Sequence, residues 1–126
     1  MSFLPSMDAA HLQEKAIAYR EINQNGQKGI VFSSYPLPPA RFDAEKADVL
    51  ILLPQGYPDV PPDMFFTLPW VRLKSGHFPK AADQAFNFEN QTWQRWSRHN
   101  NEWRAGVDGI WTMLKRVDTA LQTAAA

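Results

Sequence analysis

Four prolines within nine residues, set between two apolar segments, constrain the fold of this chain more than any other feature. They are Pro54, Pro58, Pro61 and Pro62. Because proline fixes φ and has no backbone N–H, residues 54–62 can belong neither to a helix nor to the interior of a sheet. Residues 48–53, apolar after the first position, predict a central strand that is covered on both faces, and residues 64–68 predict the next strand. The sequence therefore predicts a strand, a stiff loop and a second strand.

Two further strands and two helices are expected around this centre. Gly29–Tyr35 has the β-branched and aromatic content of a strand, and Tyr19–Ile22 is its candidate hairpin partner. A short N-terminal helix is predicted after the candidate N-caps Ser6, Met7 and Asp8. Apolar residues at helical spacing predict an amphipathic C-terminal helix from Val107 to Leu121, capped by Gly106 or Asn101.

These elements predict an α+β fold in one domain spanning residues 1–126. About four strands form an antiparallel meander, with the N-terminal and the C-terminal helix packed on it. Residues 74–101 are polar and show little periodicity, so they are expected to form a long loop. Because a compact domain tolerates such a loop mainly when it has a function, the functional residues are expected there.

The composition excludes several classes of function. Thirteen Lys and Arg balance thirteen Asp and Glu, so no overall field attracts nucleic acid or an anionic membrane. The sequence has no apolar run long enough to span a bilayer and no basic leader, so a cytoplasmic location is expected. With no cysteine and three scattered histidines, the chain has no disulfide and no thiolate, and neither a metal site nor a cofactor is expected.

The strand, proline loop and strand resemble the centre of the ubiquitin-conjugating enzyme superfamily. The Tyr57-Pro58 pair is followed after two residues by Pro61-Pro62, and then by Phe65-Phe66. In that superfamily such residues are structural. The resemblance thus implies that five residues shape a rigid loop beside the active site: Pro54, Tyr57, Pro58, Pro61 and Pro62.

Further along, the chain departs from the chemistry of that superfamily. A His-Pro-Asn signature and a catalytic cysteine are expected there, but this chain has Gly76-His77-Phe78-Pro79, with no asparagine after the proline and no cysteine in residues 80–90. No thioester can form on this sequence, although an engineered replacement of a native cysteine stays open. Ser97 could form an oxyester only with an adjacent base, because a hydroxyl is a far poorer nucleophile than a thiolate.

The whole chain most resembles the bacterial family E of ubiquitin-conjugating-like proteins. The residues that carry this resemblance are 76–79, 93–100, Trp103-Arg104 and 106–108. The resemblance implies three partners: a ubiquitin-like protein, possibly of several domains, an activating enzyme, and a metal-dependent deubiquitinase-like protein.

Aromatic and cationic side chains are concentrated between residues 93 and 104, and two interpretations of them stay open. The tryptophans can anchor a long loop to the sheet while the arginines stack on them. Alternatively, Trp and Arg form a protein-binding surface, since both are enriched at binding hot spots. The candidate binding residues are His77, Trp93, Arg95, Trp96, Arg98, His99, Trp103 and Arg104.

Three classes of function follow. The main hypothesis is a catalytically inactive, conjugating-enzyme-like protein that binds a ubiquitin-like protein, its activating enzyme, or both. The second is a cysteine-independent transferase or hydrolase that acts through Ser97 or His99, with Asp83 or Glu89 orienting the histidine. The third is a structural subunit of an oligomer that uses the tryptophans at its contact.

Overall fold

The computed structural model describes residues 2–99 and 102–126. Within them the chain forms two helices and six strands. In chain order these are α1 (Ser6–Glu14), β1 (Tyr19–Gln24), β2 (Gln27–Pro36), β3 (Lys46–Leu53), β4 (Phe65–Leu68), β5 (Gln84–Phe88), β6 (Gln91–Trp96) and α2 (Ile110–Gln122).

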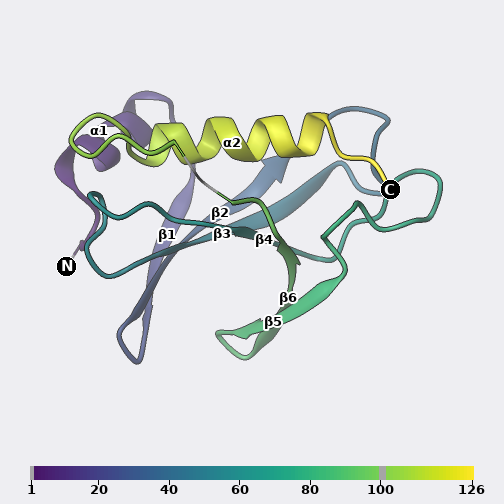
Figure 1. Ribbon diagram of the computed structural model, residues 1–126, viewed down its shortest axis with the longest axis horizontal. Helices are drawn as coiled ribbons and strands as arrows, with labels where there is room; N and C mark the ends of the chain where they lie inside the picture. Colours follow the sequence, from purple (N-terminus) through teal and green to yellow (C-terminus); the bar gives the residue numbers. More distant parts are fainter. Residues whose placement is uncertain (1, 100–101) are drawn as a thin grey trace.

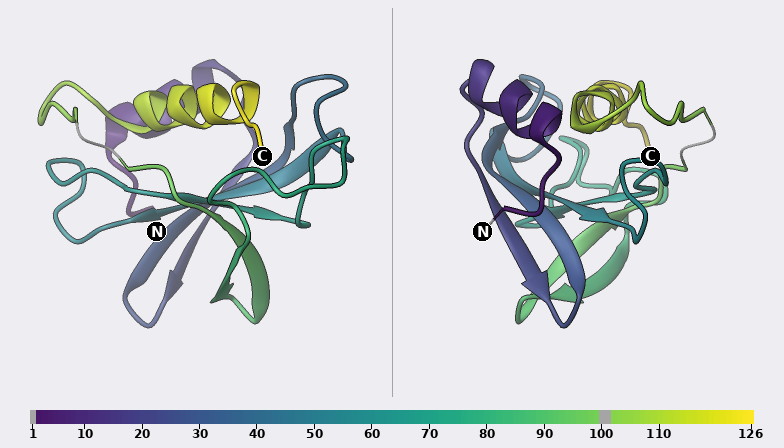
Figure 2. Two further views of the ribbon diagram at one scale, coloured as in Figure 1. Left: turned by 45° about the vertical axis from the view of Figure 1, so that its right-hand side comes forward. Right: turned by 90° about the vertical axis from the view of Figure 1, so that its left-hand side faces the viewer.

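The strands form one antiparallel sheet in the order β1-β2-β3-β4-β6-β5. Both helices lie on the same side of this sheet, with α2 running along its length (Figures 1 and 2). The predicted α+β class is confirmed. The prediction of about four strands is wrong, because β5 and β6 add a hairpin to the predicted meander.

The β5–β6 hairpin lies inside the segment that was predicted to be a long loop. Its two-residue turn consists of Glu89 and Asn90, with φ of 55° and 58°. Hairpin turns of this kind need positive φ at both central positions and usually carry Asn or Gly. Glu89 is an unusual residue for the first of them, so the sequence gives only a weak turn signal at this point.

The predicted strands and the proline loop agree with the structure. β3 is buried on both faces, since Val49 and Ile51 pack under the helices while Leu50 packs on the opposite face. Residues 54–62 form turns and no regular element. The central strand and the stiff loop are thus confirmed.

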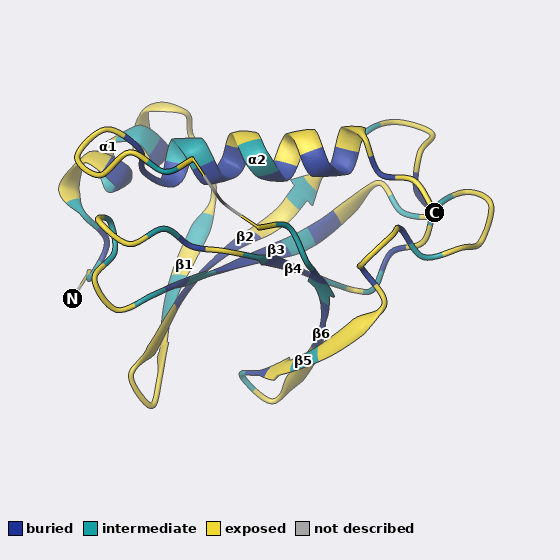
Figure 3. Cartoon of the chain, in the orientation of Figure 1, coloured by how far each residue is buried: buried dark blue, intermediate teal, exposed yellow. Residues whose placement is uncertain are grey.

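The main core lies between the helices and the sheet. The predicted helical spacing is confirmed, because α2 buries Ile110, Leu114, Val117 and Leu121 on the side that faces the sheet (Figure 3). The helix begins at Ile110 and not at Val107, whose side chain is 55% exposed.

The predicted caps of both helices also need correction. Gly106 lies in the turn before α2 and does not cap it, while the other candidate, Asn101, lies outside the described residues. α1 begins at Ser6 after Pro5, with no side-chain cap. Asp8 lies within α1 and, although distant in sequence, accepts a hydrogen bond from the Ile110 N–H at the start of α2 (3.3 Å).

A second, smaller core lies on the sheet face opposite the helices. It consists of Val31, Leu50, Phe66, Phe88 and Trp93. The two outer hairpins project to this side (Figure 1) and are joined to each other. Arg20 donates two hydrogen bonds of 3.0 Å to Glu89, and the Glu89 N–H donates to Gln24 Oε1 at 2.7 Å. The sheet therefore curls around the second core and encloses it.

Candidate functional site

The proline loop is fastened to α1 and to the segment that precedes α2. Tyr57 donates its hydroxyl hydrogen to Asp8 at 2.5 Å and packs on Trp103, with the two ring centroids 6.3 Å apart. Trp103 Nε1 donates to the carbonyl of Pro58 at 2.8 Å. Burial, reinforced by the hydrogen bond to Asp8, raises the pKa of the Tyr57 hydroxyl well above its usual range. The loop is thus positioned by contacts that its sequence neighbours do not provide.

The structure does not gather the eight candidate binding residues into one surface. Trp93 and Trp96 are fully buried, the former in the second core and the latter in the main core. Their indoles are already paired, because Trp93 donates to the Phe88 carbonyl and Trp96 to Thr67 Oγ1. A partner cannot touch either ring in this structure, so the expectation of direct binding through them is corrected: both rings belong to the cores.

The other candidates lie in different places. His77 is exposed on the loop between β4 and β5 and contacts Ser75 Oγ at 3.2 Å. Arg95 is half-buried in β6, and its Nε atom has no hydrogen-bond partner among the residues that the structure describes. Arg104 pairs with Asp108 before α2, and its hydrogen bonds hold the pKa of that carboxyl below the usual range. Two of the eight, Arg98 and His99, line the same hollow.

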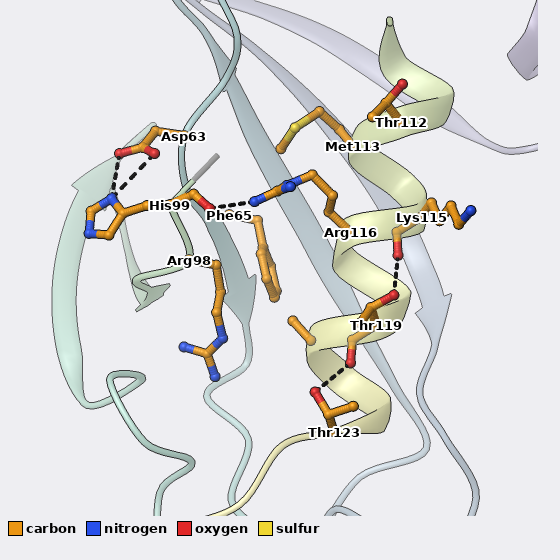
Figure 4. A pocket seen from close by; sticks show the side chains of 11 residues that line it. Asp63, Phe65, Arg98, His99, Thr112, Met113, Lys115, Arg116, Thr119 and Thr123 are labelled. Atoms are coloured by element: carbon orange, nitrogen blue, oxygen red, sulfur yellow. Dashed lines mark hydrogen bonds and ion pairs between the residues drawn. The ribbon is translucent and has the colours of Figure 1, made fainter. Parts of the chain in front are cut away.

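That hollow is a groove of about 410 Å³ between α2 and residues 97–99, and we call it the α2 groove. Its lining also includes Asp63, Phe65, Thr112, Met113, Lys115, Arg116, Thr119, Ala120 and Thr123. The apolar part of the lining is supplied by Phe65, Met113 and Ala120, all nearly inaccessible. Figure 4 shows Arg98 and Arg116 entering the groove from opposite walls, while the Lys115 ammonium is turned to the other side of α2.

Both arginines are held by backbone carbonyls. Arg98 Nη1 donates to the carbonyls of Lys80 and Ser97, each at 3.1 Å, and its guanidinium lies 5.3 Å from the centroid of the Trp96 ring. Partial burial lowers the pKa of Arg98. Arg116 reaches across the groove and donates to the carbonyl of His99 (Figure 4). Trp96 therefore supports the groove from within the core.

Asp63 and His99 form an exposed pair at the rim of the groove. His99 Nδ1 lies 3.2 Å from Asp63 Oδ2 and 3.4 Å from Oδ1. A carboxylate can orient a histidine in a general base, but such a base also needs a nucleophile within hydrogen-bond reach. No hydrogen bond joins the Ser97 hydroxyl to a base anywhere in the described part of the chain. The structure thus contributes nothing that favours the serine-based alternative.

Ser97 instead lines a second hollow of about 380 Å³, which shares Arg98 and Thr123 with the α2 groove. Here the final residues of the chain lie against the loop, because the Lys80 N–H donates to the Ala125 carbonyl at 2.7 Å and Arg41 donates to the Ala124 carbonyl at 2.9 Å. The two hollows adjoin, and together they form a path along the end of α2.

Metal and membrane sites can be assessed over residues 2–99 and 102–126. This part of the chain holds no cluster of three or more His, Cys, Asp or Glu side chains that could bind a metal ion. None of its helices has the length and apolarity needed to cross a bilayer.

Sequence reasoning missed most of the groove lining. Asp63 directly follows the proline pair, and Arg116 is one of several polar residues on the exposed side of a helix. Neither has a local pattern that marks it as a site residue. Of the lining residues, Arg98 and His99 were candidates from the sequence, because they lie between the tryptophans of residues 93–104.

Comparison with known protein families adds evidence that is independent of this geometry. The model of one family, described as prokaryotic E2 family E, matches residues 4–124. No curated protein matches the chain. No solved structure matches it either. The match covers both helices, all six strands and the α2 groove, and the α+β arrangement is consistent with an E2-like fold. The chain therefore belongs to prokaryotic E2 family E, a family of conjugating-enzyme-like proteins.

Proposed function

We propose that this protein is a conjugating-enzyme-like binding module that holds a ubiquitin-like protein, its activating enzyme, or both, without forming a covalent bond to them. One observation carries the proposal: a chain of this family contains no cysteine. Conjugating enzymes carry their protein as a thioester, and none can form here. What the fold still offers is a surface for noncovalent recognition.

The α2 groove is the part of that surface best suited to a protein tail. It combines apolar side chains with two guanidinium groups, and Arg is among the residues enriched at binding hot spots. It also lies beside the polypeptide that follows β6, which belongs to the segment where the sequence predicted function. The proline loop, fixed by Tyr57 and Trp103, leads directly into Asp63 of the groove lining.

The proposal is tested by calorimetry with the purified protein and a ubiquitin-like protein encoded beside it. We expect a dissociation constant in the micromolar range, about −8 kcal/mol at 1 μM. Arg98→Glu places a negative charge in the groove and is expected to weaken binding at least tenfold. Lys46→Glu changes the charge of the whole protein equally but lies on β3 and lines neither hollow, and it should leave binding within about threefold.

Titrations with the activating enzyme and with the metal-dependent deubiquitinase-like protein of the same pathway extend the test to the other partners. An absence of binding at concentrations of several hundred micromolar for the ubiquitin-like protein and for the activating enzyme would refute the proposal. Equal losses for Arg98→Glu and Lys46→Glu would show that the binding surface is not the α2 groove.

A further inference from the structure

Two guanidinium groups face the α2 groove, and within the described residues neither is paired with a carboxylate. Arg98 donates to the carbonyls of Lys80 and Ser97 and lies over the ring of Trp96, and Arg116 donates to the carbonyl of His99. A guanidinium has five N–H donors, so both groups keep donors that can receive a ligand.

The position of these charges favours an anion. Arg98 is partly desolvated, and a desolvated cation gains more from an opposite charge than an exposed one does. Asp63, the acidic residue of the lining, lies at the rim against His99. The groove as built therefore has an excess of positive charge around an apolar floor.

The two arginines are suited to a single anionic group. They enter from opposite walls, while Lys115, the other cation of the lining, is directed away (Figure 4). A row of acidic side chains would need a row of cations, which the groove does not have. Arginine binds a carboxylate through two parallel hydrogen bonds, and this pairing is stronger than a neutral hydrogen bond.

The adjoining hollow shows that an extended backbone with small side chains fits at this end of α2. There the chain's own Ala124 and Ala125 offer their carbonyls to Arg41 and to the Lys80 N–H. A second peptide that approaches in the same manner would come to Arg98, which lines both hollows.

We infer that the α2 groove binds the C-terminal carboxylate of an extended peptide segment, held between Arg98 and Arg116, with small side chains between the two walls of the groove. This inference rests on the proposed function, because the segment would be the flexible tail of the ubiquitin-like protein. A free carboxylate marks a tail that is neither activated nor conjugated. The protein would thus bind the unconjugated form in preference.

Three synthetic peptides test the inference by NMR titration of the isotope-labelled protein. They are an acetylated hexapeptide of alanine and glycine with a free C-terminal carboxylate, the same peptide as its amide, and the amide with one internal aspartate. We expect the free acid to bind with a dissociation constant near about 1 mM, and at least tenfold more tightly than either amide.

Two substitutions locate the carboxylate. Arg98→Gln and Arg116→Gln should each weaken binding of the free acid about tenfold or more, since a charge-assisted hydrogen bond contributes about 1.5–3 kcal/mol. The matched control Lys46→Gln removes one positive charge from an exposed side chain of β3 that lines neither hollow, and it should leave the affinity unchanged. The dispersion of the protein's backbone N–H signals shows that each variant is folded.

Equal binding of acid and amide, or tighter binding of the aspartate peptide, would overturn the inference, as would equal effects of all three substitutions. The proposed function fails on different data. If the whole ubiquitin-like protein binds while the peptides do not distinguish acid from amide, the proposed function stands and the carboxylate inference is lost. If the free-acid peptide binds and the whole ubiquitin-like protein does not, the carboxylate inference stands and the proposed function is lost.

Discussion

Tyr57 and Tyr35 each donate a hydroxyl hydrogen to an aspartate, but the two pairs lie in different environments. Asp8, the acceptor of Tyr57, is only 2% exposed and also accepts the Ile110 N–H at the start of α2. Asp118, the acceptor of Tyr35, is exposed on α2. A buried carboxylate that loses a donor cannot replace it with water, whereas an exposed one can.

The first prediction compares these two tyrosines. Tyr57→Phe should lower the free energy of unfolding by about 1–3 kcal/mol, because the buried Asp8 loses a hydrogen bond. Tyr35→Phe removes the same atom and should cost less than about 1 kcal/mol. Urea unfolding followed by tryptophan fluorescence measures both. Equal losses would mean that Asp8 is reached by water.

At the scale of elements, the β5–β6 hairpin depends on its buried face more than on its ion pair. Trp93 is fully buried and donates to the Phe88 carbonyl at 3.1 Å. The Arg20–Glu89 ion pair joins the two outer hairpins at 3.0 Å, but both side chains keep a large exposed fraction, 47% and 37%. Exposed ion pairs contribute little, because water screens them.

The second prediction follows from that contrast. Trp93→Phe leaves a space and an unpaired carbonyl in the second core and should lower stability by about 1–3 kcal/mol. Glu89→Gln keeps the side chain's size but removes its charge, and should cost less than about 1 kcal/mol. Thermal unfolding by circular dichroism measures both. A larger loss for Glu89→Gln would show that the ion pair holds the sheet in its curled form.

A buried amide explains how the irregular segment after β4 is held in place. Gln94, fully buried in β6, donates to the carbonyls of Val71 and Ala82 at 3.0 and 2.8 Å. Its oxygen accepts hydrogen bonds from the Val71 N–H at 2.7 Å and from the Thr67 hydroxyl at 2.9 Å. Residues without regular structure are thus tied to the sheet through one side chain.

The whole molecule combines a conjugating-enzyme-like fold with the absence of a thiol. The third prediction concerns what it can carry. Incubation with activating enzyme, ATP and the ubiquitin-like protein should yield no adduct in an intact mass spectrum, because the sequence has no cysteine and no base among residues 2–99 and 102–126 is hydrogen-bonded to the Ser97 hydroxyl. An adduct that survives reductant and is released by alkali would contradict this, and its loss in Ser97→Ala would place an oxyester on that residue.

The oligomer hypothesis also belongs to this scale. Trp93 and Trp96 are enclosed within one chain, while Trp103 is half-buried against the proline loop. A contact between subunits that used the first two would require the cores to open. Any assembly of this protein is therefore expected to use other residues.

The sequence by itself determined the elements whose signal is local. The four prolines excluded regular structure between β3 and β4, the apolar run identified the doubly covered central strand, and the helical spacing identified the buried side of α2. These features depend on backbone chemistry and on periodicity, so a single chain is enough to recognise them. The resemblance to the ubiquitin-conjugating enzyme superfamily rests on the proline loop and the two strands beside it.

Only the tertiary structure decided where the aromatic and charged side chains lie. Trp93 and Trp96 are three residues apart in one strand, so they face opposite sides of the sheet and enter different cores. Gln94 looks like a surface residue until its four hydrogen bonds are seen. The α2 groove joins residues 63, 98 and 116, which no local pattern connects. Burial and pairing are long-range properties, and they arise only when the sheet, the loop and the last helix pack together.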